Sequence, residues 1–136
     1  MYSLKWIVPI VLLCIVACHP KMQSADTNSA DATTTTYTDL NVEQFAGMMN
    51  KKNVVVLDVR TPEETAQGKI DGAMEINVLE DDFADKVQTL DKKKTYLVYC
   101  RSGRRSQKAV EIMAGEGFKK LYNLLGGYNA WFAEKN

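Results

Sequence analysis

Apolar and polar positions alternate along residues 37–136 in a pattern that predicts strands and helices in turn. Two stretches are almost continuously apolar, NVVVLDV at 53–59 and TYLVYC at 95–100. Such runs are typical of strands buried on both faces of a parallel sheet. Shorter apolar runs predict two more strands, at 72–78 and 120–124.

Helical spacing of apolar residues occurs beside and between these runs. The predicted helices span 39–51, 61–68, 81–90, 104–118 and 127–135. In the last of them we expect the aromatic side chains of Tyr128, Trp131 and Phe132 to anchor the helix in the core. Because strands and helices alternate, the sequence predicts an α/β three-layer sandwich with a mainly parallel central sheet flanked by helices.

The first residues have the features of a targeting signal rather than of a folded domain. Lys5 precedes the apolar run WIVPIVLLCIVA at 6–17, which is too short for a membrane-spanning helix and suits a signal peptide. The run ends in IVAC, which resembles a bacterial lipoprotein signal with Cys18 as the acylated first residue of the mature chain. The alternative is an ordinary signal peptide cleaved nearby, with Cys18 incidental.

Residues 18–36 are polar and contain almost no apolar side chain, so they cannot bury enough surface to order themselves. We therefore expect a signal peptide at 1–17, a disordered tether at 18–36 and one folded domain at 37–136. This organisation predicts a monomer in the bacterial cell envelope, periplasmic and held to a membrane through a lipid anchor only.

Charge and cysteine usage exclude several classes of function. The 136 residues carry 17 basic and 17 acidic side chains, which gives no indication of a nucleic-acid binder. The single histidine, His19, lies in the predicted tether, so we expect no cysteine–histidine hydrolase and no metal site. After loss of Cys14 and lipidation of Cys18, Cys100 remains alone and cannot form an internal disulfide.

The segment CRSGRR places that thiol between the end of an apolar strand and the start of a helix. Gly103 permits a curled backbone whose N–H groups point inward, and the helix adds the positive end of its dipole. Arg101, Arg104 and Arg105 add formal charge. The sequence therefore predicts an anion-binding loop that lowers the pKa of Cys100 below its free value of about 8.5.

The same residues also have simpler interpretations. Cys100 could be a buried structural cysteine, but a buried charge beside it would need a partner and none is near in sequence. The arginines could be a solvated helix start, although cations at a helix N-terminus oppose the dipole. Asp58 could pair with Arg60 or cap a turn, and we expect that structural role.

Four segments in a consistent order resemble the rhodanese sulfurtransferase family. CRSGRRS is similar to its active-site loop, LDVRTPEE at 57–64 to its upstream signature, and LLGGYNAW at 124–131 to its C-terminal signature. GKIDGAMEIN at 68–77 is similar to a further family segment, with Lys69 in place of the usual histidine. Together these segments cover most of residues 37–136.

The resemblance implies roles for particular residues. Cys100 would be the nucleophile that carries a persulfide, and Asp58 and Arg60 would brace the loop. The substrate-binding loop would consist of Arg101, Ser102, Gly103, Arg104 and Arg105. Related phosphatases and arsenate reductases have a loop one residue longer that ends in arginine, and that position here is Ser106.

We therefore predict a thiosulfate sulfurtransferase without a cofactor. It would move sulfur from a small anionic donor to cyanide or a thiol through a persulfide on Cys100. The alternatives are a persulfide-carrier or protein-interaction module of low turnover and, with less support, a phosphatase or arsenate reductase.

Overall fold

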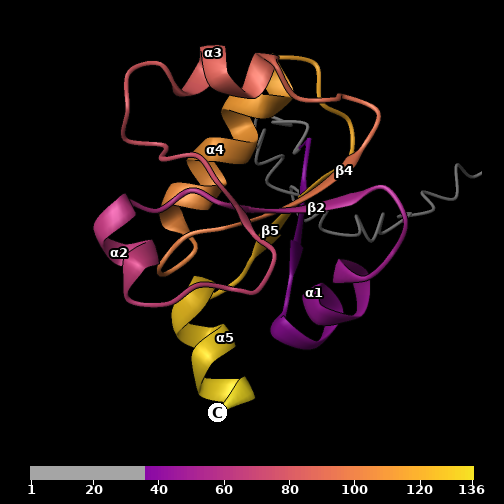
Figure 1. Ribbon diagram of the computed structural model, residues 1–136. Helices are drawn as coiled ribbons and strands as arrows, with labels where there is room; N and C mark the ends of the chain where they lie inside the picture. Colours follow the sequence, from indigo (N-terminus) through magenta and orange to yellow (C-terminus); the bar gives the residue numbers. More distant parts are fainter. Residues whose placement is uncertain (1–35) are drawn as a thin grey trace, which may run out of the picture. The chain divides into compact units, whose positions relative to one another are not determined.

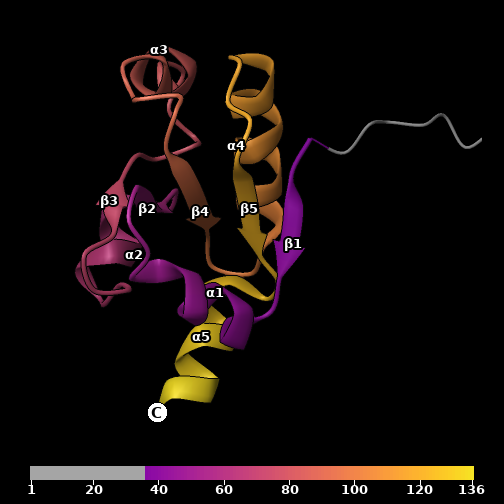
Figure 2. The same ribbon diagram turned by 90° about the vertical axis from the view of Figure 1, so that its right-hand side faces the viewer.

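The computed structural model of the chain describes residues 36–136, and these contain a single parallel sheet. The strands are β1 (Thr38–Leu40), β2 (Val54–Asp58), β3 (Met74–Glu75), β4 (Thr95–Tyr99) and β5 (Leu121–Leu124). They lie in the order β1-β5-β4-β2-β3, and every neighbouring pair is parallel. Figure 2 shows them side by side in this order. The predicted signal at 1–17, Cys18 and the tether up to residue 35 lie outside the described residues.

Five helices alternate with the strands. They are α1 (Val42–Met49), α2 (Pro62–Ala66), α3 (Phe83–Gln88), α4 (Arg104–Gly115) and α5 (Gly127–Lys135). The α/β architecture predicted from the sequence is confirmed. None of these helices, within residues 36–136, is long and apolar enough to cross a membrane.

The sequence pattern missed one strand. Residues 39–51 were predicted to be a single helix, but Thr38–Leu40 form β1, which pairs with β5 at the sheet edge. The helix starts only after Asn41, whose side chain accepts a hydrogen bond from the Gln44 backbone N–H. In return, the Asn41 backbone N–H donates to the Gln44 side-chain oxygen. Because an edge strand of three residues with two polar side chains has almost no apolar signal, only its pairing with β5 reveals it.

Side chains of the central strands alternate between two cores, as a pleated strand requires. Tyr96, Val98 and Cys100 lie in the core under α3 and α4, whereas Leu97 and Tyr99 lie in the core under α1 and α5. Figure 1 shows α1 and α4 on opposite sides of the strands. The fold is thus a three-layer α/β/α sandwich.

Parallel pairing brings the carboxyl ends of the central strands to one edge of the sheet. Asp58 at the end of β2 is in register with Tyr99 at the end of β4, and Cys100 follows directly. In α/β sheets ligands bind beyond this edge. The two chemically informative segments of the sequence, 57–64 and 100–106, therefore meet there.

Candidate active site

Cys100 lies at the base of the loop that connects β4 to α4. The residue is only 1% exposed, and its sulfur accepts a hydrogen bond from the Gly103 backbone N–H, at 3.1 Å. Gly103 has φ +97°, in the left-handed region that favours glycine, and a Cβ there would lie 3.3 Å from the Leu124 carbonyl oxygen and the Gly126 nitrogen. The loop therefore curls back over the sulfur, as the sequence predicted.

Neutral hydrogen-bond donors control the ionisation of this thiol. Burial raises the pKa of Cys100, but hydrogen bonds from the Ser106 hydroxyl and from the backbone N–H groups of Ser106, Ser102 and Gly103 outweigh it, so the pKa lies below its ordinary value. The Ser106 hydroxyl oxygen is 3.4 Å from the sulfur. The sequence argument gave the arginines a large share of this effect, yet the main contributions come from uncharged groups.

The first turn of α5 holds the beginning of the loop. The backbone N–H groups of Tyr128 and Asn129 donate to the carbonyl oxygens of Cys100 and Arg101, at 2.7 and 3.0 Å. At Gly127 (φ +58°) a Cβ would lie 2.4 Å from the Cys100 carbonyl oxygen. These contacts turn the first two carbonyl groups of the loop toward α5, which leaves the later N–H groups free to point at the sulfur.

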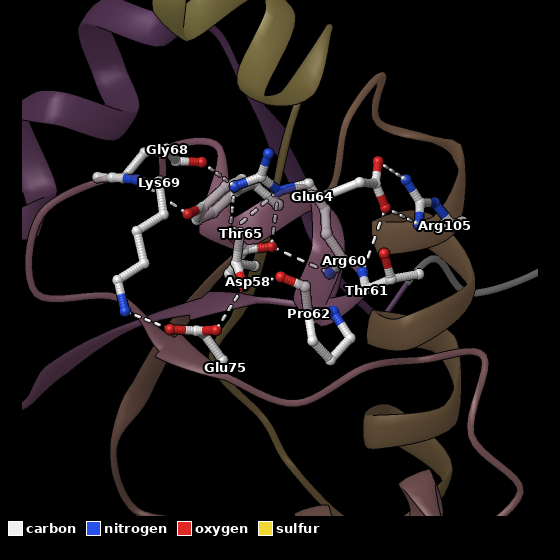
Figure 3. Close-up of polar contacts among 12 residues, drawn as sticks. Asp58, Arg60, Thr61, Pro62, Glu64, Thr65, Gly68, Lys69, Glu75 and Arg105 are labelled. Carbon is white, nitrogen blue, oxygen red and sulfur yellow. Dashed lines mark hydrogen bonds and ion pairs between the residues drawn. The ribbon is translucent and has the colours of Figure 1, made fainter.

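The loop arginines differ in their surroundings. Arg105 forms a two-pronged ion pair with Glu64 of α2, whose oxygens lie 2.7 Å from Nη1 and Nη2 (Figure 3). The Arg105 hydrogen bonds hold the pKa of Glu64 down at about 2 although burial opposes them. Arg101 and Arg104 are exposed, like Ser102. The charge of Arg105 is therefore neutralised by a partner 41 residues away in sequence.

Asp58 and Arg60 form a buried ion pair beside the loop. Arg60 Nη2 lies 2.7 Å from Asp58 Oδ2 and 2.8 Å from the Gly68 carbonyl oxygen (Figure 3). Burial alone would lower the pKa of Arg60, but the bonds to Asp58 raise it overall. The Arg60 guanidinium carbon lies 4.2 Å from the centre of the Tyr128 ring. The pair thus supports Tyr128, whose N–H holds the Cys100 carbonyl.

A cleft of about 480 Å³ opens beside the loop. Its lining residues are Arg60, Glu64, Gln67, Arg101, Tyr128, Asn129 and Phe132. Phe132 was expected to anchor α5 in the core, but its side chain is 55% exposed. Trp131 does pack against the core beside Phe45, with ring centres 6.2 Å apart. Phe132 instead forms an apolar wall of the cleft, next to the exposed Arg101.

A family model for the rhodanese-like domain matches residues 41–134. The chain belongs to the rhodanese-like domain family. The Bacillus subtilis protein YtwF, provisionally named a sulfurtransferase, is 40% identical over 83 residues, which cover 61% of this chain and 78% of the relative. The thiosulfate sulfurtransferase GlpE of Pseudomonas putida is 34% identical over 91 residues, covering 67% of this chain and 81% of GlpE.

Solved structures agree with this assignment of the family. A rhodanese-related protein from Thermoplasma volcanium superposes with a TM-score of 0.63 at 31% identity, over 72% of this chain and 93% of the other. The fold of the described residues is thus that of rhodanese-like domains.

Sequence reasoning singled out the loop at residues 100–105 and gave Asp58 and Arg60 a supporting role, but it missed the other contacts that support the loop. Glu64 was not singled out, although two glutamates directly after a strand that ends at the same sheet edge were an available signal. The contacts of Gly127, Tyr128 and Asn129 with the loop had no local signal, because they depend on how α5 packs. Among the predicted site residues, only Cys18 lies outside the described part of the chain.

Proposed function

We propose that the protein is a sulfurtransferase that carries a sulfane sulfur as a persulfide on Cys100. The observation that carries the proposal is the Cys100 sulfur at the base of a loop of inward-pointing N–H groups, with Gly103 N at 3.1 Å and a lowered thiol pKa. Because the lowered pKa favours the thiolate, the sulfur needs no separate general base to attack.

The reaction consists of two sulfur transfers that balance without a cofactor. The Cys100 thiolate attacks the outer sulfur of thiosulfate, an S–S bond forms, and the S–S bond of the donor breaks with release of sulfite. The persulfide charge then lies on the outer sulfur, within reach of the loop N–H groups. Cyanide or a thiolate attacks that outer sulfur and releases thiocyanate or a new persulfide, which restores the Cys100 thiolate.

The residue after Arg105 favours sulfur transfer over phosphate chemistry. A phosphatase loop of this kind would need an arginine at position 106 to bind the equatorial phosphate oxygens. Ser106 is fully buried, and its hydroxyl oxygen lies 3.0 Å from the Gly103 carbonyl oxygen and 2.6 Å from Asn123 Oδ1. A short loop suits a single sulfur atom better than a tetrahedral phosphate.

Names of relatives support the same class of reaction. YtwF has a provisional sulfurtransferase name, and GlpE is named a thiosulfate sulfurtransferase. We extend thiosulfate from GlpE to this chain as the donor to be tested first. Arg101 is exposed and lines the cleft, which supports a role for its charge in attracting an anionic donor.

The test is intact-mass analysis of the full chain after incubation with thiosulfate, with the Cys100→Ser variant as control. We expect a gain of one sulfur atom that is lost when cyanide is added, and no gain in the variant. Absence of the added sulfur in the unsubstituted protein, or its presence in the variant, would overturn the proposal. Hydrolysis of a phosphate ester without sulfur loading would favour the phosphatase instead.

A further inference from the structure

A chain of polar side chains leads from the Cys100 sulfur to the edge of the sheet. The Ser106 hydroxyl oxygen lies 3.4 Å from the sulfur and 2.6 Å from Asn123 Oδ1. Asn123 Nδ2 donates in turn to Asp39 Oδ1, at 2.8 Å. Ser106 is fully buried and Asn123 is 3% exposed, whereas Asp39 is exposed on β1 in register with Asn123.

Asp39 fixes which end of the Asn123 amide faces the site. An ionised carboxylate can only accept hydrogen bonds, so the NH₂ group of Asn123 must point at Asp39. The amide oxygen then points at Ser106, and this oxygen can only accept.

Ser106 has one hydroxyl proton and three neighbours that compete for it. Asn123 Oδ1 at 2.6 Å and the Gly103 carbonyl oxygen at 3.0 Å are both closer than the sulfur at 3.4 Å. When the proton lies toward Asn123, Ser106 presents a lone pair to the sulfur. That arrangement suits an S–H group, which can donate to the lone pair, and does not suit a thiolate, which needs a donor.

We propose that Asp39 is a positioning residue that reduces, without abolishing, donation by the Ser106 hydroxyl to the Cys100 thiolate, because it directs that hydroxyl toward Asn123 for part of the time. The arrangement suits the persulfide, because its charge lies on the outer sulfur and the inner sulfur needs no donor. Asp39 would thereby favour loading of Cys100 over the free thiolate. The inference takes the nucleophile from the proposed function, but ionisation of Cys100 is measured without any sulfur donor.

Other charged groups surround Cys100, and none of them belongs to the chain from Ser106 to Asp39. Arg105 of α4 interacts with the sulfur and is paired with Glu64 of α2, whose pKa of about 2 leaves it ionised. Arg101 lies in the loop itself. Asp58 at the end of β2 and Arg60 two residues later form their own ion pair, and burial raises the pKa of Tyr99 on β4. A change in the titration of Cys100 caused by a substitution at Asp39 is therefore assigned to the polar chain or to the lost charge.

The experiment compares Asp39→Asn, Ser106→Ala and the double variant in the full chain. The rate of alkylation by iodoacetamide is followed at the Cys100 peptide by mass spectrometry from about pH 5 to pH 10, a range that spans the free-thiol pKa. In Asp39→Asn the Asn123 amide can turn its NH₂ group to Ser106, which frees the hydroxyl to donate to the thiolate. We expect the pH at which the alkylation rate reaches half its plateau, the midpoint, to fall by about one unit. A shift of this size corresponds to the free energy of a hydrogen bond to a charged group.

The double variant separates this chain from a direct effect of charge. In the Ser106→Ala background we expect Asp39→Asn to leave the midpoint unchanged. An unchanged midpoint in the single variant, or an equal shift in both backgrounds, overturns the proposal. Asp85→Asn removes an exposed carboxylate from α3 and controls for the change in net charge. Asp39→Ser gives a second neutral replacement at position 39.

Sulfur loading by thiosulfate, measured separately by intact mass, distinguishes this inference from the proposed function. A shifted midpoint without loading would contradict the sulfurtransferase and keep the role of Asp39. Sulfur loading with an unshifted midpoint would support the sulfurtransferase and contradict the role of Asp39.

Discussion

Arg105 and Glu64 form a bidentate ion pair, with both nitrogen–oxygen distances at 2.7 Å, between the loop that contains Cys100 and the helix that follows β2. Both side chains are about one-quarter exposed, at 25% and 24%. The pair joins two segments that meet only because their strands are parallel neighbours. It fixes the end of the loop and removes the net charge of its last arginine.

Glu64→Gln tests how much this pair contributes to stability. The pKa of Glu64 falls from 4.5 to about 2 in the folded protein, so its stabilisation is complete above about pH 5 and is lost as the pH falls toward 2. We expect the variant to lose about 1–2 kcal/mol of unfolding free energy at pH 7. Urea unfolding measures this loss, and the difference from the unsubstituted chain should shrink at pH 3. A loss of the same size from Glu111→Gln, at an exposed carboxylate on α4, would contradict the assignment.

The lowered pKa of Cys100 predicts its reactivity as a function of pH. The loop N–H groups stabilise the thiolate, and the Ser106 hydroxyl adds to this for the part of the time that it donates to the sulfur. The alkylation rate at Cys100 should therefore reach half its plateau below the free-thiol value of about 8.5. The same chain unfolded in urea is the control, and its midpoint should return to about 8.5. A folded midpoint at or above the unfolded one contradicts the role of the loop.

Gly127→Ala tests the support of the loop by α5. The added methyl group would lie 2.4 Å from the Cys100 carbonyl oxygen at a position with φ +58°, so the loop or the helix must shift. We expect sulfur loading to fall at least tenfold and stability to drop by about 2 kcal/mol or more. Gly47→Ala in α1, where a Cβ meets nothing within 4 Å, is the matched control. It should leave loading unchanged and raise stability by up to about 1 kcal/mol.

Asp58→Asn removes one partner of the buried pair with Arg60. Because Asp58 is fully buried and Arg60 only 4% exposed, the variant leaves an uncompensated buried guanidinium and should lose about 3–5 kcal/mol. Lys69→Gln breaks the exposed pair with Glu75 and should cost at most about 1 kcal/mol. Thermal and urea unfolding of both variants measure the contrast. Equal losses would show that burial does not set the strength of the Asp58–Arg60 pair.

Arg101→Gln tests the proposed approach of the donor. Of the three loop arginines, Arg101 lines the cleft, Arg105 is neutralised by Glu64, and Arg104 is exposed at the start of α4. We expect kcat/KM for thiosulfate to fall roughly tenfold in Arg101→Gln, since a charge-assisted hydrogen bond is worth about 1.5–3 kcal/mol. Arg104→Gln should change it much less. A larger effect at Arg104 would place the donor on the other side of the loop.

The sequence by itself determined the α/β class, four of the five strands and the loop that contains Cys100. Long apolar runs such as 95–100 and the residues CRSGRR are local features, and local features can be read along one segment of chain. The rhodanese-like family was likewise indicated by segments in their order.

Tertiary structure decided which groups act on the sulfur. Three sets of contacts join residues that are far apart in sequence. They are the ion pair of Arg105 with Glu64, the bonds from the Tyr128 and Asn129 N–H groups to the loop, and the polar chain from Ser106 to Asp39. Strand β1 forms through its pairing with β5. The exposure of Phe132 follows from the packing of α5. The physical reason is that hydrogen bonds and ion pairs depend on distances of about 3 Å, which parallel strand pairing and helix packing set and residue order along the chain does not.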